Sequence, residues 1–389
     1  MAQGEQSAVL GGLTPEAFFA TVWQRRPLLI RNAFPDFQPP LDAEELAGLA
    51  LEPEVESRLI TGRVGGDWTL RHGPFDEADF LQAPERDWAL LVQDVEKHEP
   101  DCGWILDAFD WLPGWRIDDL MVSYAAPGGS VGPHVDAYDV FLLQGAGQRR
   151  WRIGTPGSGH AVERGGLRQH DDVDFTDEWV LGPGDMLYLP PGVPHEGVAL
   201  TPCTTWSIGL RAVSLADLAS ELADVVDDAG YLQPLPDRDR QPVGHPQELA
   251  GADLAELRVA LLTLFNDHAL LDQAIARAVT RPKPGFLDAG FLPDPDTPAQ
   301  DPCHLPDSTE LCRHPAVRLV LLPASGRRHG AVYINGDCDS DDAGVYALAR
   351  ALNVERTIQL GALRAALHTE AQRDWLRSVV ARGLWAVID

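Results

Sequence analysis

Short apolar runs separated by glycine- and proline-rich turns characterise the chain up to about residue 212. Strands of this kind, closely spaced along a chain, are typical of an antiparallel barrel or a double-sheet jelly roll. We therefore expect a mainly β domain with some helix over residues 1–212, and "LQGAGQRR" (143–150) is predicted to be a hairpin turn between two strands. The predicted strands lie in 26–32, 118–124, 139–145, 149–154 and 184–192.

The periodicity changes after residue 212, where apolar residues begin to recur at three- and four-residue steps. Such spacing is typical of an amphipathic helix, and the hydroxyl of Ser214 is a candidate N-cap for it. The apolar positions of this stretch are Leu215, Leu218, Leu222 and Val225.

Two more helices are predicted near 251–265 and 268–279, after a polar, proline-rich link at 233–247. The sequence "RPKPGF" (281–286) ends the last of them. An all-helical insert with strong apolar stripes is often an interface, so we expect residues 213–281 to be a helical region that forms a homodimer. A helix pair packed on its own domain would give the same pattern.

The remaining residues, 282–389, contain apolar strands at "VRLVLLPA" and "AVYING", then helical stretches, and end with "GLWAVID". This order predicts a small α+β domain that is winged-helix-like. Winged helices often bind DNA, but the segment "GDCDSDDAG" (336–344) is acidic. A protein contact or a scaffold role is therefore favoured.

The formal net charge of −28 is the strongest feature of the composition. Such a surface repels nucleic acid and attracts basic partners, so we expect no direct nucleic-acid binding. Lys97 and Lys283 are the two lysines, and arginine supplies the other positive charges. A salt-adapted host would explain the acidity as well as a basic protein substrate does.

Composition also bears on the compartment and on the number of domains. A length of 389 residues with 44% hydrophobic and 23% charged residues suits a soluble protein of two or three domains. The sequence contains no apolar run long enough for a membrane span and no signal-peptide pattern, and its five cysteines do not form a disulfide framework. We expect a cytoplasmic protein without membrane contact.

A candidate metal site comes from three residues. His134 and Asp136 are two apart, so on a strand their side chains would point to the same face. The segment "GDMLYLPPGVPHEG" (184–197) presents His195 on a proline-rigidified stretch. Two imidazoles and one carboxylate form the facial triad of non-haem iron(II), whereas zinc sites normally leave fewer positions open. The alternative is a surface pair and an unrelated loop histidine.

An iron site of this kind needs a source of electrons for O2, and a 2-oxo acid can chelate the metal while its distant carboxylate is held elsewhere. Arginine suits that carboxylate because it is always charged and can bind it through two parallel hydrogen bonds. In "QRRWRIG", Arg149 shares the parity of Trp151 and Ile153 and is therefore predicted to face inward. Its partner would be 2-oxoglutarate or, alternatively, an internal salt bridge.

The run "WRIDDLMVSYAAPGGSVGPHVDAYDVFLLQGAGQRRWRIG" (115–154), with "LPPGVPHEG" (189–197), resembles the bacterial JmjC-type ribosomal oxygenases. The likeness is dense over 115–211 and looser over 18–35. Beyond 212 only the order of parts agrees. The resemblance implies a double-stranded β-helix (cupin) fold and a reaction of iron(II), 2-oxoglutarate and O2 that hydroxylates C3 of an arginine of the sixteenth large-subunit ribosomal protein. It also implies that His134, Asp136 and His195 bind the metal and that Arg149 binds 2-oxoglutarate.

A candidate substrate wall lies on the strand "DDLMVSY", where Asp119, Met121 and Ser123 share one face. If Ser123 faces the co-substrate, Asp119 and Met121 would suit the guanidinium and the methylene stem of an arginine. Tyr138 is placed to cover that stem, and Ser207 to add a hydrogen bond. A turn carboxylate for Asp119, and plain packing for Tyr138 and Ser207, are the alternatives.

Two other functions remain open at this stage. One is a JmjC oxygenase that acts on a histidine of another ribosomal protein or on a small molecule. The other is a non-catalytic, metal-binding cupin whose acidic surface docks a basic protein.

Overall fold

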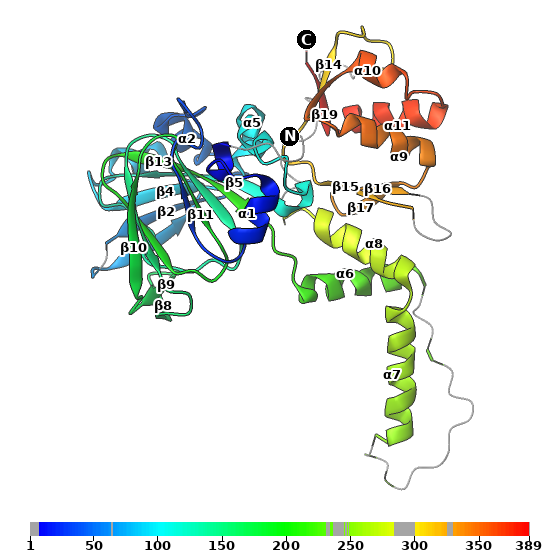
Figure 1. Cartoon of the computed structure of the whole chain (residues 1–389), viewed down its shortest axis with the longest axis horizontal. Helices are drawn as coiled ribbons and strands as arrows, with labels where there is room; N and C mark the ends of the chain where they lie inside the picture. Colours follow the sequence, from blue (N-terminus) through cyan, green and yellow to red (C-terminus); the bar gives the residue numbers. More distant parts are fainter. Residues whose placement is uncertain are drawn as a thin grey trace.

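The structure of the protein is a computed structural model that describes residues 8–63, 65–230, 249–283, 300–324 and 330–388, with residues 234, 235, 245 and 247 between them. A β-rich body, a helical region and a C-terminal α+β part follow one another along the chain (Figure 1). Most of the predicted link at 233–247, residues 284–286 of "RPKPGF" and residues 325–329 lie outside the described residues.

The β-rich body contains thirteen strands, all paired antiparallel. They are β1 (Leu28–Ile30), β2 (Ser57–Gly62), β3 (Trp68–His72), β4 (Trp88–Val92), β5 (Ile117–Ala125), β6 (Val140–Gln144), β7 (Arg149–Gly154), β8 (His160–Arg164), β9 (Leu167–Asp171), β10 (Phe175–Leu181), β11 (Met186–Leu189), β12 (His195–Ala199) and β13 (Cys203–Leu210). An eight-stranded sheet has the order β1-β11-β6-β13-β5-β4-β2-β3, and a smaller sheet has the order β10-β7-β12. Strands β8 and β9 form a separate pair.

The central strand β6 is buried on both faces. Val140 and Leu142 share an apolar core with Trp151 of β7, so this core lies between the two sheets. Phe141 and Leu143 point the other way into a core covered by N-terminal helices. This double burial explains the uninterrupted apolar run in the sequence. The helices are η1 (Ala8–Leu10), α1 (Pro15–Thr21), α2 (Ala43–Leu49), α3 (Glu77–Leu81), α4 (Val95–His98), η2 (Pro100–Gly103), α5 (Trp104–Asp107) and η3 (Gly114–Arg116).

The hairpin predicted at 143–150 is wrong, because β6 and β7 belong to different sheets. The turn carries the chain from the large sheet to the small one. At Gly145 an added Cβ would lie 2.7 Å from the indole nitrogen of Trp206, so the turn approaches the large sheet closely. Both strands turn apolar side chains into the same core, and that packing separates them into facing sheets.

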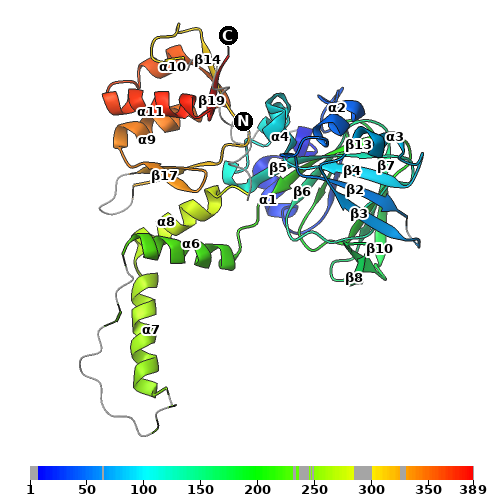
Figure 2. The same ribbon diagram turned by 180° about the vertical axis from the view of Figure 1, so that it is seen from behind.

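The helical region consists of α6 (Leu215–Asp228), α7 (Gly251–Phe265) and α8 (His268–Thr280). The predicted N-cap is confirmed, since the Ser214 hydroxyl accepts a hydrogen bond from the Asp217 amide. Helices α6 and α8 pack through an apolar cluster that includes Leu222 and Leu270. Figures 1 and 2 both show α7 projecting away from the rest of the molecule.

The C-terminal part is α+β, as predicted. Its elements are β14 (Glu310–Arg313), β15 (Leu319–Leu322), β16 (Ala331–Ile334), β17 (Asp337–Ser340), α9 (Ala343–Leu352), β18 (Thr357–Gln359), α10 (Leu360–Arg364), α11 (Glu370–Ala381) and β19 (Trp385–Ile388). Two three-stranded sheets, β18-β14-β19 and β15-β16-β17, share one apolar core with the helices. The winged-helix assignment stays a prediction. In the described part of the chain, no helix has the length and apolarity needed to cross a membrane.

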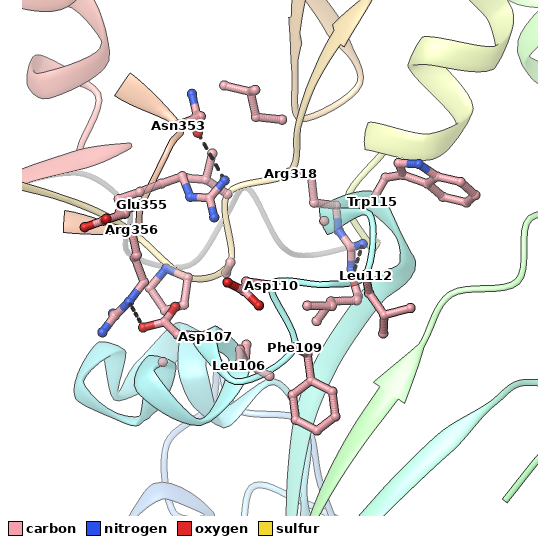
Figure 3. Close-up of a pocket in the computed structure, with 18 of the residues that line it drawn as sticks. Leu106, Asp107, Phe109, Asp110, Leu112, Trp115, Arg318, Asn353, Glu355 and Arg356 are labelled. Carbon is pink, nitrogen blue, oxygen red and sulfur yellow. Dashed lines mark hydrogen bonds and ion pairs between the residues drawn. The ribbon is translucent and has the colours of Figure 1, made fainter. Parts of the chain in front are cut away.

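A cavity of about 840 Å³ lies between the C-terminal part and the β-rich body (Figure 3). Ion pairs across this interface join Arg356 to Asp107 at 3.0 Å and Arg318 to Asp118 at 2.8 Å. The second pair matters for the site, because Asp118 is the neighbour of Asp119 on β5.

Candidate metal centre and co-substrate pocket

The three predicted metal ligands converge. The Asp136 carboxylate lies 3.9 Å from Nε2 of His134 and 3.5 Å from Nε2 of His195. One donor atom from each residue lies within 4.8 Å of the others, and no second group of three such side chains occurs among the described residues. The spacing suits three ligands on one side of a single ion.

The backbone fixes the orientation of both imidazoles. Nδ1 of His134 lies 3.0 Å from the Gly132 carbonyl, and Nδ1 of His195 lies 3.0 Å from the Val193 carbonyl. Each Nδ1 therefore carries the proton and donates it, which leaves the Nε2 lone pair directed at the metal position. Burial, together with the neighbouring imidazole, lowers the pKa of His195. A neutral imidazole is the form that binds a metal.

The expectation that His134 and Asp136 lie on a strand is wrong. His134 forms an isolated bridge with His195, in which each amide donates to the other's carbonyl at 2.9 Å, and Asp136 lies in the irregular segment that follows. Because His195 begins β12, this bridge attaches the ligand-bearing loop directly to the small sheet. The backbone bridge therefore brings the two histidines together, and alternation along a strand does not.

Arg149 faces inward, as its parity predicted. It is 4% exposed, while its neighbours Arg150 and Arg152 are half-buried on the other face of β7. Its guanidinium lies 5.1 Å from the ring of Trp151, whose ring in turn lies 5.9 Å from that of His195. Trp151 therefore packs against both the guanidinium and a candidate metal ligand.

Only neutral groups surround this guanidinium within the described residues. Its Nη1 donates to the hydroxyls of Ser123 at 3.3 Å and Thr205 at 3.1 Å, and its Nη2 to the Gly197 carbonyl at 3.5 Å, while Nε has no acceptor. The internal salt bridge considered from the sequence is absent there, and burial lowers the pKa of Arg149. A buried charge without a counter-charge is costly, so this pocket is suited to an incoming carboxylate.

Thr205 is a pocket residue that the sequence analysis missed. It lies opposite Ser123 in the register of β13 and β5. Its parity matches that of Ser207, which was proposed, so strand alternation would have found it. Gly197 is a second, since an added Cβ would lie 2.8 Å from Nε of Arg149. The glycine leaves the room that the guanidinium occupies.

The predicted substrate wall extends from this pocket along β5. Ser207 lies opposite Met121, and Asp119 continues the same face as Ser123. Ser207 and Asp119 are buried, whereas Met121 is half-buried and Tyr138 is 43% exposed. Burial and the nearby charges of Asp136 and Asp119 raise the pKa of Tyr138.

Asp119 belongs to an acidic cluster that holds a cation from the same chain. The Lys283 ammonium lies 3.0 Å from Asp119, 3.2 Å from Asp94 and 3.4 Å from Asp118. Burial, opposed by Lys283, raises the pKa of Asp119 to about 6. Lys283 was not among the residues predicted from the sequence. Its rarity, as one of two lysines, was the available signal.

Comparisons with known proteins agree with this geometry. Residues 105–218 match a family model described as a JmjC domain. The "Ribosomal protein uL16 3-hydroxylase" of Escherichia coli K12 is 41% identical over 263 residues, which are 64% of this chain and 66% of that protein. The "Probable ribosomal oxygenase" of Haemophilus influenzae is 35% identical over 301 residues, 73% of each chain.

Solved structures resemble the whole chain. An X-ray structure of Escherichia coli YcfD has a TM-score of 0.84 at 33% identity, and the match covers 97% of this chain and 98% of that one. Another, of YcfD "in complex with Cobalt and 2-oxoglutarate", has a TM-score of 0.82 at 34% identity, with coverage of 97% and 99%. The predicted cupin fold is thereby confirmed. The chain belongs to the JmjC ribosomal oxygenases, a family whose chemistry depends on iron(II), 2-oxoglutarate and O2.

Proposed function

We propose that this protein hydroxylates C3 of one arginine side chain of the sixteenth large-subunit ribosomal protein. The observation that carries the proposal is the line of groups on the inner face of β5. Ser123 contacts the buried Arg149, and Asp119 lies farther along the same wall, past Met121. The E. coli relative is named for 3-hydroxylation of uL16, which supports the same substrate here.

In this proposal His134, Asp136 and His195 bind iron(II), and Arg149, Ser123 and Thr205 hold the distal carboxylate of 2-oxoglutarate. Bound iron with this co-substrate and O2 supplies the oxidising power, and succinate and CO2 leave as co-products. The protein's contribution is placement, because a C–H bond held close to the iron reacts far faster than a freely diffusing one.

The substrate side chain would lie along the wall described above. Asp119 binds the guanidinium with help from Ser207, while Met121 and Tyr138 pack against the methylene stem. A carboxylate at this depth favours a permanently charged side chain over a neutral histidine. The net charge of −28 also favours docking of a basic ribosomal protein.

Mass spectrometry of the ribosomal protein incubated with enzyme, iron(II), 2-oxoglutarate and air tests the function. We expect one added oxygen on a single arginine and no addition with Asp136→Ala. Consumption of 2-oxoglutarate without that product would indicate a histidine or small-molecule substrate. No consumption at all would indicate a non-catalytic binding protein.

The domain limits proposed are 1–212 for the JmjC domain, 213–281 for the helical region and 282–389 for the winged-helix-like domain.

We further propose a homodimer through α7. Five of its large apolar side chains are 45–61% exposed, and a helix of this length is marginal in water without a partner. We also propose a cytoplasmic location, which a ribosomal protein substrate supports. The exposed large apolar side chains of α7 are Leu257, Val259, Leu261, Leu262 and Phe265.

A further inference from the structure

Lys283 follows helix α8 and reaches the β-rich body, where its ammonium contacts three carboxylates. Its side chain is 29% exposed and forms part of the wall of a groove of about 520 Å³. Tyr138 and Asp118 line the same groove, so it opens beside the substrate wall. Burial opposes the charge, but the carboxylates outweigh it and raise the pKa of Lys283.

The Lys283 ammonium pairs with Asp119, the carboxylate that would bind the substrate guanidinium in the proposed function. Oδ2 of Asp119 accepts from Lys283 at 3.0 Å and from Nε2 of Gln93 at 3.3 Å. A guanidinium binds a carboxylate best through two parallel hydrogen bonds that use both oxygens. Two cations on one carboxylate also repel each other in a site with little water. Lys283 and a substrate arginine therefore compete for Asp119.

Asp118, one of the two other carboxylates, has a second cationic partner. Asp118 accepts hydrogen bonds from Arg318 of the C-terminal part at 2.8 Å, and the Arg318 side chain is 8% exposed. Asp118 therefore keeps a cationic partner when Lys283 leaves. Among the described residues Lys283 is the one cation within ion-pair distance of Asp119. Departure of Lys283 therefore frees the Asp119 carboxylate of the predicted substrate wall and leaves Asp118 paired.

We propose that Lys283 is an internal competitor that occupies the arginine subsite of the free enzyme and is displaced by the substrate guanidinium. This inference rests on the proposed function and adds a determinant of specificity to it. A substrate side chain must bind Asp119 more tightly than the Lys283 ammonium does. Otherwise its displacement of Lys283 yields no net binding free energy. The apparent affinity for the substrate is the intrinsic affinity multiplied by the fraction of free enzyme in which Lys283 does not pair with Asp119.

The first test compares Lys283→Gln with Arg377→Gln at pH 8, above the pKa of about 6 of Asp119. Arg377 is a matched control, because it too is a cation held by three carboxylates, but on α11 of the C-terminal part. We expect Lys283→Gln to lower the KM for the ribosomal protein by about three- to tenfold with kcat within about twofold. Arg377→Gln should leave both unchanged, and Lys283→Arg should not lower KM.

A KM for Lys283→Gln equal to or above that of wild type would overturn the inference and make Lys283 a structural counter-charge. Thermal melts of each variant show whether it is folded. If wild-type enzyme does not hydroxylate the ribosomal protein, the proposed function fails on that result alone.

The second test does not require turnover. The wild-type enzyme is acylated with an amine-reactive reagent under argon, with and without N-acetyl-arginine amide, and the two lysines are compared by peptide mass spectrometry. Displacement should raise labelling of Lys283 relative to Lys97 as the arginine compound is added, and N-acetyl-glutamine amide should not. Labelling of Lys283 that is constant or falls would contradict displacement.

Discussion

Arg149→Met should affect the stability of the protein in opposite directions without and with 2-oxoglutarate. In the protein without co-substrate the Arg149 charge is buried among hydroxyls and a carbonyl, with no carboxylate partner among the described residues. Methionine has a similar length and no charge. The hydrogen bonds lost are each worth about 1 kcal/mol, whereas relief of an unpaired buried charge is worth more.

We expect the variant without co-substrate to be about 1–2 kcal/mol more stable than wild type. For a body of this size, that corresponds to a rise in Tm of roughly 2–8 °C. The loaded protein should behave in the opposite way. At a concentration of 2-oxoglutarate about 100 times its Kd, wild type gains about 2.7 kcal/mol, and Arg149→Met gains almost nothing because the carboxylate has lost its partner.

The assay is thermal unfolding with Mn²⁺ present and O2 excluded, with and without 2-oxoglutarate. Arg152→Met is the matched control on the same strand. Arg152 pairs with Glu196, which is fully buried, so its loss leaves an uncompensated carboxylate and should cost about 3–5 kcal/mol. Two results would refute an unpaired Arg149 charge that binds 2-oxoglutarate. One is that Arg149→Met destabilises the protein without co-substrate as much as Arg152→Met does, and the other is that 2-oxoglutarate still raises the Tm of Arg149→Met.

Three further outcomes are expected. Asp119→Ala should abolish arginine hydroxylation while iron binding, measured by metal analysis, is retained, and activity near wild type would reject Asp119 as the guanidinium ligand. Burial raises the pKa of Glu96 to about 8 from 4.5, so the folded state retains a proton that the unfolded state releases, and stability falls as pH rises between these values. Glu96→Gln should therefore have a higher Tm than wild type at pH 8.5 and an equal one at pH 4, and a constant difference would refute this explanation. Leu261→Asp on α7 should shift light scattering from dimer to monomer, and an unchanged mass would exclude α7 as the dimer contact.

The sequence alone predicted the kind of chemistry and the local placement of several candidate residues. The side-chain chemistry of His134, Asp136 and His195 restricted the kind of metal ion. Strand alternation placed Arg149 on the inner face of β7 and Arg152 on the outer face. It also placed Asp119 and Ser123 on one face of β5. Such predictions are possible from the sequence because each depends only on local periodicity or on the chemistry of a single side chain.

Only the tertiary structure decided how distant segments meet. The bridge between His134 and His195, the assignment of β6 and β7 to separate sheets, and the contact of Lys283 with Asp119 all join residues through packing of the whole chain. The pairing of Asp118 with Arg318 likewise depends on where the C-terminal part docks. No local pattern encodes these contacts, because each one arises from the free energy of burying surfaces that are far apart in the sequence.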